Sequence, residues 1–80
     1  MARVRLFAAA REAAGTADDV VPGATLDEVL AEAVRRFGGD FARVLPTCKV
    51  WINGEEAPRT TRVGAEDEVA VLPPVSGGAA

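Results

Sequence analysis

The sequence contains no histidine and no tyrosine, and cysteine, methionine and tryptophan each occur once. Histidine is the commonest general base and metal ligand near neutral pH, so its absence argues against self-contained hydrolytic or metal chemistry. The single cysteine, Cys48, excludes an internal disulfide and any multi-cysteine metal site. We therefore expect no catalytic residue and no metal site in this chain.

An excess of positive charge is also missing, because nine Lys and Arg residues stand against twelve Asp and Glu residues. Nucleic-acid binding without sequence preference needs a basic surface that displaces phosphate counterions, so this class of partner is not expected. No apolar run approaches the roughly 20 residues of a membrane span, and no signal-peptide hydrophobic region follows the first residues. We expect a cytoplasmic protein without a membrane partner.

What the sequence does contain is aliphatic: apolar residues make up 49% of its 80 residues, with few aromatics among them. This composition predicts one packed domain near the lower size limit for an unaided hydrophobic core. We place that domain at residues 1–72 and a flexible C-terminal tail at residues 73–80.

The first half of the chain predicts two strands and a helix. Residues 4–7 alternate with period two, which predicts a strand with Val4 and Leu6 buried and Phe7 on the other face. Residues 8–15 form a helical turn or a loop, and residues 17–21 form a second strand. Thr25 followed three residues later by Glu28 predicts a capped helix start, and an apolar stripe continues the helix to Gly38.

The second half predicts three more strands. Residues 40–46 are consistent with one further short turn, and residues 48–52 are β-rich, with Trp51 facing outward. Asn53-Gly54 is typical of a type I′ turn. Residues 55–65 are polar and predict a short edge strand and a loop, and residues 68–72 form the last strand.

This order of elements predicts an α+β fold with a mixed sheet and one main helix across one face. The ubiquitin-like β-grasp is the small fold that fits the order. In that fold the last strand lies centrally, beside and parallel to the first strand, which the periodicity by itself does not establish.

The last nine residues differ from the rest of the chain. Pro73 and Pro74 end sheet pairing because proline donates no backbone hydrogen bond, and the residue before each proline stays extended. After Val75 and Ser76 come Gly77 and Gly78, which allow a partner to approach the backbone closely. The tail can therefore enter a narrow cleft of another protein, although chain ends are also often frayed.

Other candidate residues have weaker signals. Cys48 lies in an apolar strand, where a thiol is usually structural and inert. The acids Glu55, Glu56, Glu66, Asp67 and Glu68 are typical of a solvated surface that steers a basic partner. The sheet face away from the helix is expected to carry Arg3, Arg5, Phe7, Lys49, Trp51, Ala70 and Leu72. This mixture is typical of a docking surface, unless a loop covers its apolar members or Trp51 belongs to the core.

The chain resembles the sulfur carriers of the MoaD/ThiS family over almost its whole length. The similarity rests on these segments: Val4-Arg5-Leu6-Phe7-Ala8, Arg11-Glu12, Gly15, Thr25-Leu26, Asn53-Gly54-Glu55, Asp67-Glu68-Val69-Ala70 and Pro73-Pro74-Val75-Ser76-Gly77-Gly78. The ending after the Asp-Glu-Val-Ala strand is specific to the MoaD type, the small subunit of molybdopterin synthase.

This resemblance implies a carrier that binds no cofactor and has no catalytic residues of its own. An E1-like enzyme that uses ATP adenylates the carboxylate of Gly78, and sulfur replaces the adenylate to give a thiocarboxylate. The large synthase subunit accepts the tail, Pro73 to Gly77, in a channel, and the sulfur enters molybdopterin. Phe7 and Leu72 match positions where the family docks its partners.

Two features depart from the family pattern. Ala79-Ala80 follow the two glycines, so a peptidase must remove them before Gly78 becomes terminal, unless they are extraneous or the chain is inactive. The turn before the last strand, residues 64–68, also differs in its local sequence. The acceptor of the sulfur stays open between molybdopterin, thiamine, cysteine, a tRNA base and a secondary metabolite. Two further hypotheses are a ubiquitin-like modifier and an interaction module without transfer chemistry.

Overall fold

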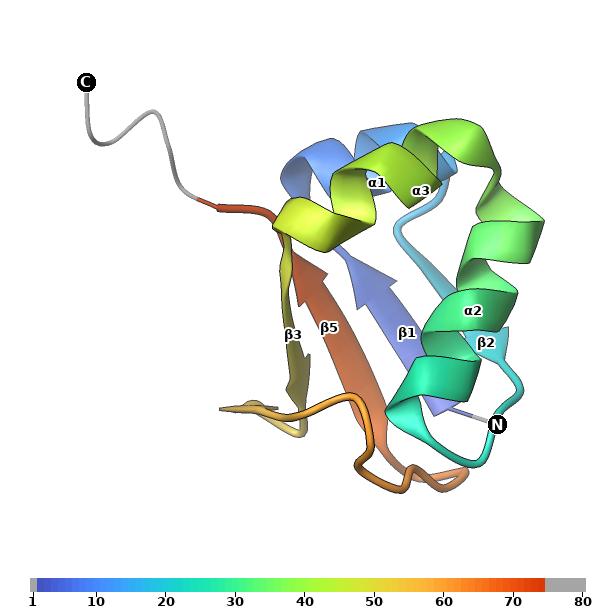
Figure 1. Cartoon of the computed structure of the whole chain (residues 1–80), viewed down its shortest axis with the longest axis vertical. Coiled ribbons are helices and arrows are strands. Elements are labelled where there is room, and N and C mark those ends of the chain that lie inside the picture. The colour runs from blue at the N-terminus through green and yellow to red at the C-terminus, as the bar shows by residue number, and fades with distance from the viewer. Residues whose placement is uncertain (1, 75–80) are drawn as a thin grey trace.

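A five-stranded mixed sheet organises the computed structural model, which describes residues 2–74 (Figure 1). Its strand order is β2-β1-β5-β3-β4, with β1 and β5 parallel and the other neighbouring strands antiparallel. The strands are β1 Ala2–Leu6, β2 Asp18–Val21, β3 Lys49–Ile52, β4 Glu55–Glu56 and β5 Glu68–Leu72. The predicted central position of the last strand is confirmed, and the fold is the ubiquitin-like β-grasp.

Within the described residues, three α-helices and one 3₁₀ turn cover one face of this sheet (Figure 1). They are α1 Ala8–Ala14, α2 Leu26–Phe37, α3 Gly39–Val44 and η1 Leu45–Thr47. The predicted main helix is α2. The segment expected to be a single turn or a loop is instead the seven-residue helix α1, which ends at Gly15 with a left-handed φ of 79°. Helix α1 packs against α3, and this tertiary contact stabilises a helix that is too short to persist alone.

The hydrophobic core lies between the helices and the sheet. Val4, Leu6, Val69 and Val71 are buried on the strands, as the alternation predicts, and Phe41 of α3 is fully buried. Its ring meets that of Phe37 edge to face at 5.3 Å between centroids. The burial of Val63 was not predicted, because it lies in the polar segment of residues 55–65.

The start of α2 forms as its sequence predicts. Thr25 is the N-cap, and its hydroxyl accepts a hydrogen bond from the Glu28 N–H at 3.2 Å. The Glu28 carboxylate accepts in return from the Ala24 N–H at 2.8 Å. The first bond satisfies a backbone donor that a helix start leaves free, and the second fixes the residue before the N-cap. Within residues 2–74, none of the helices is long and apolar enough to cross a membrane.

Candidate docking site and tail junction

The sheet face away from the helices carries a continuous set of side chains from three neighbouring strands. Arg5 on β1 pairs in register with Ala70 on β5, and Ala70 pairs with Trp51 on β3. Two residues further along β5, on the same face, Leu72 is paired with Lys49 on β3. The predicted composition of this outer face is therefore confirmed for these strands, and Trp51 is not part of the buried core.

An apolar pocket of about 270 Å³ lies on this face. Its lining residues are Phe7, Trp51, Gly54, Glu68, Ala70 and Leu72. The structure thus places Phe7 and Leu72, the two residues proposed for docking, in one pocket although they are far apart in the sequence. Glu68 and Gly54 were not predicted to belong to it. The alternation of β5 contains the signal for Glu68, because it shares a face with Ala70 and Leu72.

Phe7 is held at the pocket by its place at the end of β1. Its backbone is still extended, with φ −125° and ψ 149°, and its N–H donates to the Val71 carbonyl at 3.3 Å. The next residue, Ala8, has a φ of 50°, and α1 starts there. The chain therefore turns away immediately after Phe7, and this residue stays 39% exposed on the outer face.

Charged side chains lie on the same sheet face as Phe7. The Arg5 guanidinium lies 5.9 Å from the centroid of the Phe7 ring, a distance at which the cation attracts the ring face. Arg5 also forms an ion pair with Glu68 at 3.5 Å, and Lys49 forms one with Glu56 at 3.6 Å. All four charged side chains are about half exposed or more, so these pairs orient the surface and add little stability.

The tail begins at the end of β5, next to the pocket. Leu72 is the last strand residue and lines the pocket, Pro73 is half-buried, and Pro74 is exposed. Sheet pairing stops at Leu72, as the two prolines predict. The other tail residues singled out in the sequence (Val75, Ser76, Gly77 and Gly78) lie outside the described residues, as do Ala79 and Ala80.

The predicted tight turn is joined to the start of β5 by Asn53. Asn53 and Gly54 have φ values of 52° and 86°, both positive as a type I′ turn requires. The Asn53 side chain donates to Asp67 at 2.9 Å and accepts from the Glu68 N–H at 2.9 Å. The bond from Asn53, together with one from the Gly64 N–H at 2.8 Å, lowers the pKa of Asp67. These contacts fix Gly54 and Glu68 at the pocket.

Cys48 lies just before β3, half-buried against the core, rather than inside the strand. Its thiol donates to the Val44 carbonyl at 3.3 Å, and burial raises the pKa of the thiol above its usual range. A thiol that stays protonated is a poor nucleophile, which supports the structural interpretation of Cys48. Among residues 2–74, no three His, Cys, Asp or Glu side chains gather closely enough to hold a metal ion.

Comparison with known proteins places this arrangement in a family. The ThiS family model matches residues 4–78. SAMP1 from Haloferax volcanii is 34% identical with a TM-score of 0.79, and the match covers 95% of this chain and 97% of that one. The small archaeal modifier protein 1 from Methanosarcina acetivorans is 28% identical with a TM-score of 0.86, and the coverage is 96% and 95%.

A third solved structure, assigned as molybdopterin converting factor subunit 1 from Pyrococcus furiosus, shares the fold. It is 22% identical with a TM-score of 0.78, and the match covers 92% of this chain and 97% of that one. The family match begins within β1 and ends at the second tail glycine, so it includes the pocket and the tail as far as Gly78. The chain belongs to the ThiS family of ubiquitin-like sulfur carriers.

Proposed function

We propose that this protein carries sulfur on the carboxylate of Gly78 and delivers it for the synthesis of molybdopterin. An E1-like enzyme adenylates that carboxylate with ATP, and a sulfur nucleophile then displaces AMP to leave a thiocarboxylate. The observation that carries this proposal is the adjacency of the apolar pocket to the start of the tail at Pro73. A partner that docks at the pocket therefore has the start of the tail next to the surface that it binds.

The geometry supports a division of labour between this chain and its partners. Phe7 and Leu72 supply apolar anchors, and Pro73 and Pro74 end the sheet pairing so that the tail is free to leave β5. Val75, Ser76 and Gly77 then enter the partner's channel, where small side chains leave room for the backbone. Catalytic groups belong to the activating enzyme and to the large subunit of molybdopterin synthase. This proposal needs no cofactor bound to this chain.

The proposal also needs Ala79 and Ala80, which follow Gly78, to be removed, because Gly78 has a free carboxylate only when it is the last residue. We infer that a peptidase trims the chain after Gly78. The family match ends at Gly78, which supports this boundary.

Intact-mass analysis of the protein from the organism that encodes it tests these steps together. We expect loss of the two alanines and the mass increase of one sulfur replacing one oxygen. A chain ending at Gly78 should react with ATP and an activating enzyme, and the same chain carrying Gly78→Ala should react poorly. Protein that always retains both alanines, with an unreactive chain ending at Gly78, would contradict the proposal.

A second candidate is a protein modifier that joins Gly78 to lysines. The 34% and 28% identities to two small archaeal modifier proteins favour it. Extracts in which this chain has been tagged at its N-terminus distinguish the two functions. Covalent adducts that form with the parent chain and disappear with Gly78→Ala indicate a modifier. If the parent chain forms no adducts and Gly78→Ala abolishes molybdopterin synthesis, the protein is the carrier.

A further inference from the structure

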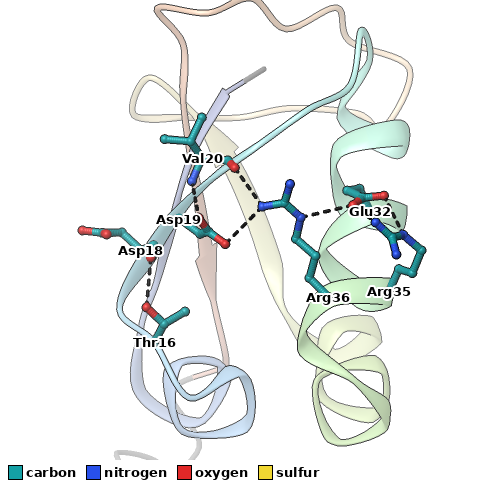
Figure 2. A network of polar contacts seen from close by, with 7 residues as sticks. All are labelled: Thr16, Asp18, Asp19, Val20, Glu32, Arg35 and Arg36. Carbon is teal, nitrogen blue, oxygen red and sulfur yellow. Dashed lines mark hydrogen bonds and ion pairs between the residues drawn. The ribbon is translucent and has the colours of Figure 1, made fainter.

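Figure 2 shows polar contacts that join the free edge of β2 to α2. None of the residues of β2 lines the docking pocket. An edge strand presents unpaired N–H and C=O groups that can pair with a strand of another molecule. At the opposite edge of the sheet, β4 has only two residues, so β2 is the longer edge.

The register with β1 determines which groups of β2 point outward. Leu6 N–H donates to the Ala17 carbonyl at 2.8 Å, and Val4 pairs with Asp19 in the same register. Antiparallel neighbours alternate between pairs that exchange hydrogen bonds and pairs that do not. The backbone groups of Asp19 are thus directed at β1, whereas those of Asp18 and Val20 point away from the sheet.

Side chains of this same chain occupy three of those outward groups. The Thr16 hydroxyl donates to the Asp18 carbonyl at 2.9 Å. The Asp19 carboxylate accepts from the Val20 N–H at 2.8 Å. Arg36, which comes from α2, donates to the Val20 carbonyl at 3.0 Å (Figure 2).

Arg36 is itself held in place by two carboxylates. Its Nη1 lies 3.3 Å from Asp19 Oδ2, and its Nε donates to Glu32 Oε2 at 3.1 Å. Arg35 binds the same Glu32 from the side away from β2, with its Nε 2.9 Å from Glu32 Oε1 (Figure 2). Arg36 therefore joins the edge to the helix, and Arg35 does not touch the edge.

An uncapped β2 edge is complementary to itself. If Asp18 of one copy pairs with Val20 of a second copy across a two-fold axis, the outward N–H and C=O groups of both strands meet. Val20 is 45% exposed, and in such a pair it lies opposite Asp18 of the second copy. The same register places the two Asp19 residues directly opposite each other, where like charges destabilise pairing.

We propose that Thr16, Asp19 and Arg36 close the β2 edge to a second copy of this chain. Removal of this cap allows two copies to pair antiparallel through β2. The cap keeps the protein monomeric, and this role does not depend on which sulfur acceptor or target the protein serves.

The test compares the oligomeric state of the full chain with that of the double variant Asp19→Ala/Arg36→Ala by sedimentation across a wide concentration range. The parent should sediment as one chain, and the double variant should approach twice that mass as concentration rises. Arg35→Ala is the matched control, because it removes an arginine from the same carboxylate without opening the edge, and it should stay monomeric. If the double variant does not fold, as judged by circular dichroism, the double variant Asp19→Thr/Arg36→Gln, which removes both charges and keeps a strand-forming residue at position 19, provides the same comparison.

A second substitution locates the contact. In the proposed register residue 20 of one copy lies opposite Asp18 of the other, so Val20→Asp places two carboxylates opposite each other. Adding Val20→Asp to the double variant should therefore restore the mass of the monomer. Amide exchange at residue 20 in the double variant should become slower as its concentration rises. A folded, uncapped variant that remains monomeric, a dimer that survives Val20→Asp, or a parent that already pairs through β2 would each overturn the proposal.

Discussion

The pKa of Glu32 shows how strongly neighbouring side chains can shift the titration of a single surface carboxylate. Its carboxylate accepts hydrogen bonds from both Arg35 and Arg36, and the bond from Arg35 is the largest of the causes that lower its pKa to about 2. The ionised form is therefore favoured in the folded protein relative to the unfolded chain, where an ordinary Glu has a pKa of about 4.3.

This shift predicts a pH dependence of stability. Because the folded pKa lies below the unfolded value, the contribution of Glu32 is complete above about pH 4.3 and is lost as pH falls through about 2. Glu32→Gln should therefore be less stable than the parent at neutral pH, and the gap should shrink between pH 4 and 2. Urea unfolding at a series of pH values measures the gap. A gap that is the same at both ends of this range would contradict the prediction.

At the scale of elements, the turn between β2 and α2 depends on a residue without a side chain. Gly23 has a φ of +151°, and a Cβ there would lie 2.7 Å from the Val29 nitrogen and 2.8 Å from its Cγ2. The Val29 N–H makes one of the first hydrogen bonds of α2, to the Thr25 carbonyl at 3.0 Å. A side chain at position 23 must displace the start of the main helix.

We expect Gly23→Ala to lower the free energy of unfolding by more than about 1 kcal/mol, because both the conformation and the space are unsuitable for alanine. Gly64→Ala is the matched control, since a Cβ there would meet nothing closer than an Asp67 oxygen at 3.8 Å. It should change stability by no more than about 0.5 kcal/mol. Urea unfolding of the two variants makes the comparison, and equal losses would show that the close contact at Gly23 is unimportant.

At the scale of the whole molecule, the two halves of the outer sheet face differ. The β1-β5-β3 side holds the pocket and the tail junction, whereas the β2 side carries the exposed Val20 near the capped edge. Phe7 and Val20 are exposed to similar degrees, 39% and 45%. They therefore provide a test of whether the pocket, rather than apolar exposure in general, binds partners.

Phe7→Ala should weaken binding to the activating enzyme or to the large synthase subunit by roughly tenfold or more, as loss of a buried anchor of about 1.4 kcal/mol does. Leu72→Ala should act in the same direction. Val20→Ala should leave the affinity unchanged, because Val20 does not line the pocket. Isothermal titration calorimetry with each partner measures the three affinities. Equal effects at Phe7 and Val20 would argue against docking at the pocket.

Much of the fold could be predicted because its signals are local. The spacing of Thr25 and Glu28 indicates where α2 begins, and Asn53-Gly54 indicates a tight turn with two positive φ values. Alternation along β1 and β5 separates buried Val4 and Val69 from the outer face. Each of these signals acts between residues only a few positions apart, so the sequence order preserves it.

The sequence by itself thus determined the five strands, the main helix α2, the buried faces of β1, β3 and β5, and the Pro-Pro break at the end of β5, whereas it left α1 open. The tertiary structure decided what no local pattern could: the burial of Val63, the pocket that joins Phe7 to Trp51, and the contact of Arg36 with β2. The physical reason is that these contacts join segments far apart in the chain. The residues in contact are determined by the strand order and by how α2 packs on the sheet. The spacing of neighbouring residues specifies neither of these.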